Sequence, residues 1–114
     1  MLTTGKAVRV TIYLSEGARH HGVPVYSSIL DFLFHNDIAG ATVLKGVAGF
    51  GNRHRMHSAH LLEISDHLPI LVQFIESREK VDAVMPELIK RTGSGLIEVL
   101  ETDIVVPPRN GSTT

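Results

Sequence analysis

The chain contains no cysteine, no long apolar run and almost no net charge. Without cysteine it can form no disulfide bond, thiolate metal site or cysteine nucleophile. No stretch approaches the roughly 18 apolar residues of a membrane span, and residues 1–6 lack the apolar core of a signal peptide. Eleven Lys and Arg residues balance twelve Asp and Glu residues, which does not favour a surface built for nucleic acid. We therefore expect a cytoplasmic protein that does not bind nucleic acid.

The length of 114 residues fits a single domain that buries roughly 60–70% of its unfolded surface. We assign this domain to residues 1–106. Residues 107–114 read P-P-R-N-G-S-T-T, which is typical of a mobile tail.

The first half of the chain predicts a strand, a helix and a second strand. Residues 7–14 alternate between apolar and polar side chains, as a half-buried strand requires. A helix is expected to start near Pro24, whose fixed φ suits a first helical turn, and to end near Gly40, which suits a C-cap. Its apolar positions recur at helical spacing: Tyr26, Ile29, Leu30, Leu33 and Ile38. Branched side chains over residues 41–48 predict the second strand.

The second half predicts a strand, a helix and a last strand. Residues 68–76 are almost continuously apolar, which predicts a strand buried on both faces. Ser77 suits the N-cap of the following helix, and Pro86 predicts a kink or two short helices that meet there. The apolar stripe of this helix comprises Val81, Val84, Met85 and Leu88. Residues 92–95 break the helix, and residues 96–106 predict the last strand.

The predicted order is β-α-β-β-α-β, an α+β chain in which one supersecondary unit occurs twice. Right-handed crossovers then predict a ferredoxin-like sandwich: a four-stranded antiparallel sheet with both helices on one face. Two helices can cover only one face of the sheet, yet the later strands carry apolar residues at both odd and even positions, which point to opposite faces. We therefore expect the uncovered face to be buried by self-association.

The most informative stretch is residues 47–60, V-A-G-F-G-N-R-H-R-M-H-S-A-H, which follows the second predicted strand. Its glycines allow the backbone to turn N–H groups inward as an anion-binding nest, and the guanidinium and imidazole groups that follow would neutralise the anion. Phe50 would stack on the ligand or wedge beside it. The structural alternative is a β-bulge or tight corner at residues 49–51, followed by solvated cations.

The histidines of this stretch suggest a second interpretation, a divalent-metal site. His54, His57 and His60 are three residues apart, a period that clusters side chains on a helical turn but scatters them along a strand. No carboxylate partner is evident, and Arg53 and Arg55 would repel a cation. We therefore prefer the anion interpretation and retain the histidine loop as the alternative. For His20 and His21 we prefer a structural role at the entry to the first helix.

Catalysis is not expected. The best group that can be assembled is Asp66 with His67 and His57, but adjacent residues cannot share a strand face and no hydrolase signature surrounds them. Residues 93–95, G-S-G, lack the lysine of a P-loop, so this motif does not predict nucleotide hydrolysis.

Several segments resemble one family, the small PII-like proteins of the DUF190 group. The segments are residues 10–14 (V-T-I-Y-L), residues 40–51 (G-A-T-V-L-K-G-V-A-G-F-G), His57, residues 65–69 (S-D-H-L-P) and residues 96–97 after G-S-G. The resemblance extends over residues 7–106, and the long glycine-containing run is its most specific part.

This resemblance implies a ferredoxin-like subunit, a homotrimer with ligand sites between subunits, and a mobile loop whose shape reports the occupant to a partner. In PII proteins the ligands are adenine nucleotides, so an adenine nucleotide is the candidate ligand here, and a membrane transporter or an enzyme is the candidate target. Carried over by position, the ligand-binding residues are Gly49, Gly51, Arg53, His54, Arg55 and His57 on one side, and Thr92, Gly93, Ser94 and Gly95 on the other. Phe50, between the first two glycines, is added to them as the residue that would stack on the ligand.

The chain departs from the wider PII pattern at two points. The loop is shorter than the PII mobile loop and lacks its modifiable tyrosine, so covalent control is not expected. His67 stands where the family often has an acidic residue. The sequence thus predicts a non-enzymatic regulator of the PII-like type that binds a small anion.

Overall fold

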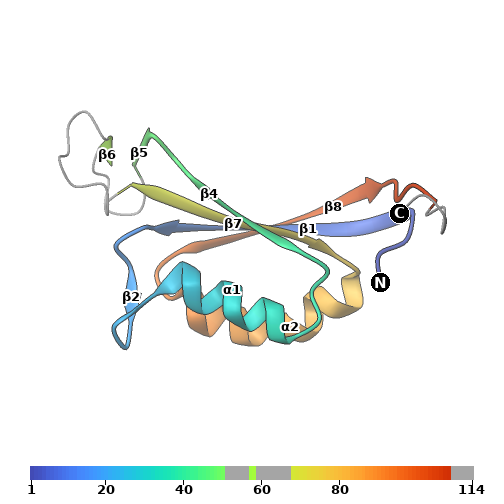
Figure 1. The fold of residues 1–114 in the computed structure, drawn as a ribbon, viewed down its shortest axis with the longest axis horizontal. Helices are drawn as coiled ribbons and strands as arrows, with labels where there is room; N and C mark the ends of the chain where they lie inside the picture. Colours follow the sequence, from blue (N-terminus) through green and yellow to red (C-terminus); the bar gives the residue numbers. More distant parts are fainter. Residues whose placement is uncertain (51–56, 59–67, 109–114) are drawn as a thin grey trace.

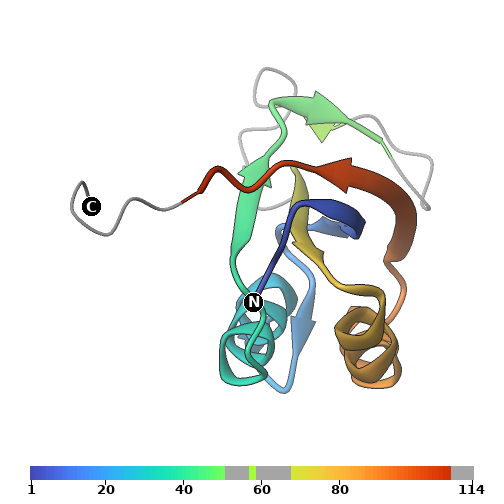
Figure 2. The same ribbon diagram turned by 90° about the vertical axis from the view of Figure 1, so that its right-hand side faces the viewer.

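The computed structural model describes residues 1–50, 57–58 and 68–108. Its main feature is a four-stranded antiparallel sheet with the strand order β4-β7-β1-β8 (Figure 1). The strands are β1 (Gly5–Ser15), β4 (Ala41–Lys45), β7 (Pro69–Glu76) and β8 (Leu96–Ile104). Two helices, α1 (Val25–His35) and α2 (Arg78–Thr92), cover one face of the sheet, as the end-on view shows (Figure 2). The predicted ferredoxin-like fold is thereby confirmed.

Two short two-stranded sheets were not predicted. β2 (Arg19–His20) pairs with β3 (Val23–Pro24) around a two-residue turn in which His21 and Gly22 have φ values of 53° and 80°. Positive φ at both central residues is the requirement of a type I′ hairpin turn. β5 (Ala48–Gly49) pairs with β6 (His57–Ser58), so the strand predicted over residues 41–48 is in fact divided between two sheets.

The core lies between the helices and the sheet, and its residues follow the periods of their elements. On β1 every second residue from Val8 to Leu14 is buried, while the helices bury residues three or four apart. The core cluster comprises Val8, Val10, Ile12, Leu14, Val25, Ile29, Leu33, Ile70, Val72, Phe74, Val81, Val84 and Leu88. The predicted stripe of α2 is therefore its packed face. For α1 the prediction is right at Ile29 and Leu33, but Val25 replaces Leu30 in the core.

The prediction that the third strand is buried on both faces is wrong for the single chain. On β7 the buried Ile70, Val72 and Phe74 alternate with Leu71 and Ile75, which are only half-buried. The reason is that both helices lie on one side, so the other face of the sheet has no second layer among the described residues.

Helix α1 ends earlier than predicted, at His35 rather than near Gly40. The backbone N–H groups of Asn36 and Ile38 both donate to the Leu33 carbonyl, and Asp37 between them adopts a positive φ of 60°. The Asn36 side chain donates to the Phe32 carbonyl at 2.8 Å. Asparagine and aspartate therefore supply the C-terminal cap that the sequence suggested for glycine.

Helix α2 begins as predicted, because the Ser77 hydroxyl accepts a hydrogen bond from the Lys80 N–H at 3.3 Å. The helix contains Pro86 but is continuous from Arg78 to Thr92, so the prediction of two short helices is wrong. Proline removes only one backbone hydrogen bond. Buried residues on both sides of it, Val84 and Leu88, hold the helix against the core.

Arg91 joins the two helices. Its guanidinium donates to the Ser28 carbonyl at 2.9 Å and to the Glu87 carboxylate at 2.8 Å, and it lies 4.9 Å from the centre of the Phe32 ring. The hydrogen bond from Arg91 holds the pKa of Glu87 below its ordinary value. One side chain thus fixes the C-terminal end of α2 against α1.

Replacing Glu87 by glutamine is expected to reduce the acid sensitivity of the fold. The folded-state pKa of Glu87 is lowered from 4.5, so the stabilising contribution of its charge is present above that value and is lost as the pH falls through the lower folded-state pKa. Urea unfolding of both proteins between about pH 6 and about pH 3 measures this effect. The free-energy difference should shrink toward low pH; a constant difference would contradict the assignment.

Glu76 is a buried acidic residue at the end of β7, with only 1% of its surface exposed. Its two carboxyl oxygens accept hydrogen bonds from the backbone N–H groups of Ala39 at 2.8 Å and of Ser77 at 3.0 Å. Lys80 adds a second link by donating to the Asp37 carbonyl at 2.7 Å. Glu76 therefore joins the α1–β4 connection to the start of α2 and fixes where β4 begins.

Candidate functional site

The two predicted walls of the ligand site lie at the same end of the sheet. We call residues 46–50 the glycine segment and residues 92–95 the α2–β8 turn. The glycine segment follows the last residue of β4, and the α2–β8 turn precedes the first residue of β8, which pairs with Tyr13 near the end of β1. In Figure 1 both lie on the left, and the chain termini lie on the right.

The glycine segment packs against the first residue of β7. The Gly46 N–H donates to the Pro69 carbonyl at 2.8 Å. A methyl group added to Gly46 would lie 2.6 Å from the Pro69 ring, and one added to Gly49 would lie 3.3 Å from it. Phe50, the last residue of the glycine segment, has 61% of its surface exposed. The close approach to Pro69 therefore supplies a structural reason for glycine at these positions.

An ion pair that the sequence analysis missed lies next to this segment. Lys45 Nζ lies 3.2 Å from Glu16 Oε1, and the Glu16 N–H donates to the Leu68 carbonyl at 2.9 Å. Lys45 is the last residue before Gly46, so a cation adjacent to the glycines was visible in the sequence. Its pairing with Glu16 was not visible in the sequence, because it depends on β1 and β4 ending at the same end of the sheet.

The α2–β8 turn is held tightly by the end of β1. Thr92 is 5% exposed, and the Gly95 N–H donates to its carbonyl at 3.1 Å. Gly93 caps α2 with φ of 62°. A methyl group on Gly95 would lie 2.6 Å from the Tyr13 carbonyl oxygen. Both glycines of the predicted G-S-G wall thus have conformational or packing roles of their own.

The single chain places the two walls over opposite edges of the sheet. β4 and β8 are the edge strands, with β7 and β1 between them. Three interstrand spacings separate the edges by roughly 14 Å. Gly49, Phe50 and the backbone of His57 form one group, because Gly49 pairs with His57, while Thr92, Gly93, Ser94 and Gly95 form the other.

The remaining predicted site residues are outside the described part of the chain. They are Gly51, Arg53, His54, Arg55 and His60, together with Asp66 and His67. Their roles in anion or metal binding stay predictions.

Within residues 1–50, 57–58 and 68–108, no three His, Asp or Glu residues are grouped so that they could hold a metal ion. His20 and His21 lie in the β2–β3 hairpin with their ring centres 4.1 Å apart. Their position in a hairpin that leads into α1 agrees with the structural role preferred for them.

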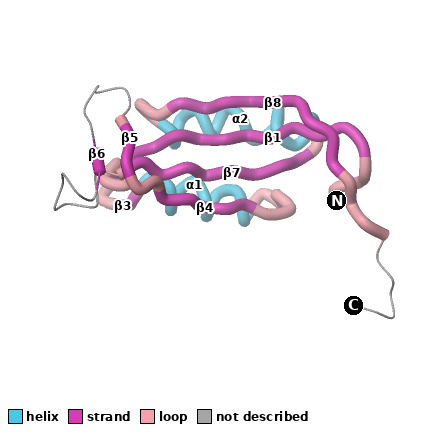
Figure 3. The backbone as a smooth tube through the Cα atoms, turned by 90° about the horizontal axis from the view of Figure 1, so that it is seen from above, coloured by secondary structure: helices cyan, strands magenta, loops and turns pink. Residues whose placement is uncertain are grey.

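Figure 3 views the sheet from the side opposite the helices, with β8, β1, β7 and β4 side by side. Three rows of side chains cross the strands in register. The first row, nearest the glycine segment, is Leu44, Leu71, Tyr13 and Leu96; the second is Thr42, Gln73, Thr11 and Glu98; the third is Ile75, Arg9 and Leu100. Two mostly apolar rows therefore flank a polar one.

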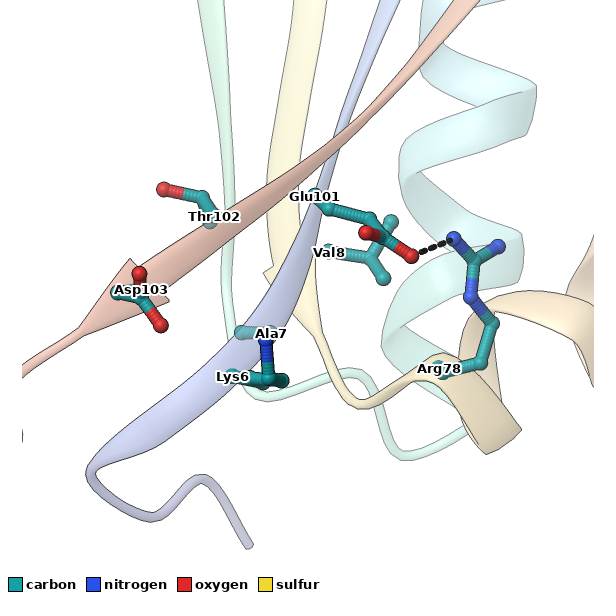
Figure 4. A pocket seen from close by; sticks show the side chains of 7 residues that line it. All are labelled: Lys6, Ala7, Val8, Arg78, Glu101, Thr102 and Asp103. Carbon is teal, nitrogen blue, oxygen red and sulfur yellow. Dashed lines mark hydrogen bonds and ion pairs between the residues drawn. The ribbon is translucent and has the colours of Figure 1, made fainter.

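A shallow hollow of about 360 Å³ lies at the other end of the sheet, near the termini (Figure 4). Its charged residues are Lys6, Arg78, Glu101 and Asp103. Arg78 pairs with Glu101 at 3.4 Å and with Asp82 at the same distance. Because cations and carboxylates alternate there and Arg78 is already paired, this hollow is a weaker candidate for an anion than the opposite end of the sheet.

In the described part of the chain, neither helix combines the length and the apolar character needed to cross a membrane.

Solved structures with a similar fold come from a PII-like protein. CPII, a nitrogen regulatory PII-like protein from Thiomonas intermedia K12 solved with ADP, AMP and bicarbonate, matches with a TM-score of 0.63 at 19% identity, over 90% of this chain and 91% of that one. Its apo form matches with a TM-score of 0.61 at 14% identity, over 90% and 95% of the two chains. At these identities the similarity establishes the fold.

Relatives in sequence identify the family. A UPF0166 protein of Methanocaldococcus jannaschii is 34% identical over 91 residues, which cover 77% of this chain and 83% of the relative. A UPF0166 protein of Aquifex aeolicus is 29% identical over 94 residues, which cover 82% and 89%. The family model of DUF190, described as Uncharacterized ACR, matches residues 7–104. The chain therefore belongs to the DUF190 family.

Proposed function

We propose that this protein is a non-enzymatic, cytoplasmic regulator of the PII-like type. It assembles as a homotrimer, binds a small anion in the clefts between subunits, and presents the loop after the glycine segment to a partner. An adenine nucleotide is the candidate ligand, and a membrane transporter or an enzyme is the candidate target.

The observation that carries this proposal is the position of the two glycine-containing segments on a PII-like fold. Both lie at one end of the sheet, over opposite edges. A ligand in contact with both must span about 14 Å or be held where two subunits meet. The PII-like protein with a similar fold was solved with ADP, AMP and bicarbonate, which are small anions.

The uncovered sheet face supports self-association. Leu44, Leu96 and Leu100 on this face are 49%, 61% and 45% exposed, and Tyr13 is 39% exposed. Exposed apolar rows of this kind are typical of an interface, because their burial removes apolar area from water. Closed cyclic oligomers are the usual way in which a chain covers such a face with copies of itself.

The regulatory step follows from differential affinity. A ligand that binds the ordered and disordered arrangements of the loop equally would shift neither, so the ligand must prefer one arrangement. The Lys45–Glu16 pair lies at the base of this loop. An anion that attracts Lys45 competes with Glu16 and would thereby couple occupancy to the end of β4.

Calorimetric titration tests the proposed ligand class. We expect ADP or another adenine nucleotide to bind, and the double variant Arg53→Ala/Arg55→Ala to bind at least about tenfold more weakly, because charge-assisted hydrogen bonds to phosphate contribute about 1.5–3 kcal/mol each. Lys6→Ala/Arg78→Ala removes the same charge at the opposite end of the sheet and should bind as wild type. Heat from zinc or nickel alone would favour the histidine-loop alternative instead.

The pH dependence of binding separates the same two interpretations. Histidines that become protonated below about pH 6.5 should strengthen anion binding and weaken metal binding, because a protonated imidazole adds positive charge and cannot ligate a metal. Repeating the titrations at about pH 6 and about pH 8 measures the trend. Anion affinity that rises with pH would contradict the electrostatic role assigned to the histidines of residues 54–60.

A further inference from the structure

The uncovered sheet face carries two charged side chains among its described residues, and they have opposite signs. Arg9 lies at the centre of the third row, between Ile75 and Leu100. Glu98 ends the polar second row, beside Thr11. The other side chains on this face of the four strands are apolar or uncharged: Ala7, Thr11, Tyr13, Ser15, Thr42, Leu44, Pro69, Leu71, Gln73, Ile75, Leu96, Leu100, Thr102 and Ile104.

The two charges are not paired with each other inside the chain. Glu98 accepts a hydrogen bond from the Tyr13 hydroxyl at 2.9 Å, a contact that raises the pKa of Tyr13. Arg9 has no ion-pair partner within the described residues. The guanidinium therefore keeps its hydrogen-bonding capacity, and the carboxylate, with several acceptor positions, can accept further bonds.

Burial of this face would be costly unless both charges found partners. A charge removed from water without a partner strongly destabilises an interface, so the apolar rows can associate only if Arg9 and Glu98 are compensated. A second copy offers one residue of each sign. The face is thus complementary in charge to a copy of itself, and a partner of one predominant charge would leave one of the two unpaired.

Building on the proposed self-association, we infer that copies of this chain dock through the uncovered sheet face and that Arg9 of one copy pairs with Glu98 of its neighbour. The pair fixes the relative orientation of the subunits, because the flanking leucines would pack in several registers with similar energy. Each interface of a cyclic oligomer then contains at least one such pair.

Charge exchange tests this pairing. Arg9→Glu and Glu98→Arg each place like charges against each other, so each single variant should dissociate at a concentration at least about tenfold higher than wild type. The double variant Arg9→Glu/Glu98→Arg restores opposite charges and should recover the wild-type oligomer. Sedimentation velocity over a dilution series measures the dissociation, and circular dichroism establishes that each variant is folded.

Two control variants separate the pair from other effects. Arg9→Glu/Glu79→Lys has the net charge of the wild type but places the compensating charge on the exposed surface of α2, so it should remain dissociated. Tyr13→Phe removes the hydroxyl that binds Glu98 without changing charge, so it should remain assembled.

The outcomes distinguish this inference from the function on which it rests. A wild-type protein that is monomeric at all concentrations would overturn both the self-association and the pairing. An assembled wild type whose single variants dissociate no more readily, or whose double variant fails to recover, would overturn the pairing alone. Recovery in the double variant and not in Arg9→Glu/Glu79→Lys would establish it.

Discussion

Replacement of Gly95 by alanine is expected to lower the free energy of unfolding by about 3 kcal/mol, at the upper end of the cost of overpacking. The new methyl group would lie 2.6 Å from the Tyr13 carbonyl oxygen and 2.9 Å from the side chains of Leu14 and Thr92. The carbonyl belongs to β1, which is paired on both sides, so it cannot withdraw without disturbing the sheet. Urea unfolding at one fixed protein concentration measures the loss.

Gly40→Ala is the matched control. No atom lies within 4 Å of a methyl group added there, and its φ is not positive. The substitution should leave the free energy of unfolding unchanged or raise it by about 0.4–1 kcal/mol, because alanine lowers the conformational entropy of the unfolded chain. Equal losses in both variants would show that the contact with Tyr13 is not the cause. Because Gly95 is also a predicted ligand-binding residue, its effect on binding is interpretable only in conditions where the variant is folded.

Replacement of Glu76 by alanine is expected to cost about 3 kcal/mol, since it removes the shared acceptor of two partly buried backbone N–H groups and leaves the buried site of the side chain empty. The groups belong to Ala39 and Ser77, and Glu76 itself is 1% exposed. The α1–β4 connection and the start of α2 would both lose their link to β7. For a chain of this length, the loss corresponds to a decrease in Tm of more than about 10 °C.

Glu76→Gln and Glu79→Ala provide the comparison. The glutamine side chain keeps one acceptor oxygen in place of two, so it should retain part of the stability. Glu79 lies in the first turn of the same helix but is exposed, and its replacement should cost less than about 1 kcal/mol. If Glu76→Ala were as mild as Glu79→Ala, the carboxyl group would not be the link between these elements.

Local periodicity predicted the fold well because it records which side of each element is buried. The alternation on β1 and the stripe on α2 were both visible in the sequence, and both correspond to core residues. One error arose from a competing local signal and the other from a tertiary contact. Gly40 suggested a helix end, but the cap formed by Asn36 and Asp37 ends α1 earlier; Pro86 suggested a break, but packing on both sides keeps α2 continuous.

The candidate site was predicted less completely, because glycine has several uses that a sequence does not separate. Gly49 and Gly95 looked like parts of anion-binding loops, and the structure adds a steric reason for each, against Pro69 and Tyr13 respectively. The same limitation applies to Lys45, whose partner Glu16 is 29 residues away in the sequence (45 − 16). Contacts between strand ends depend on the order of strands in the sheet, which no local pattern encodes.

The sequence alone determined the order of elements, the helical and strand faces that form the core, and membership of the DUF190 family, since each depends on which residue types stand at which positions. Only the tertiary structure decided that both helices pack on the same face of the sheet, that Arg9 and Glu98 share the opposite face, and that the glycine segment and the α2–β8 turn lie at one end over opposite edges. These facts depend on strand register and on the side from which the helices pack, and both are fixed only when distant parts of the chain meet.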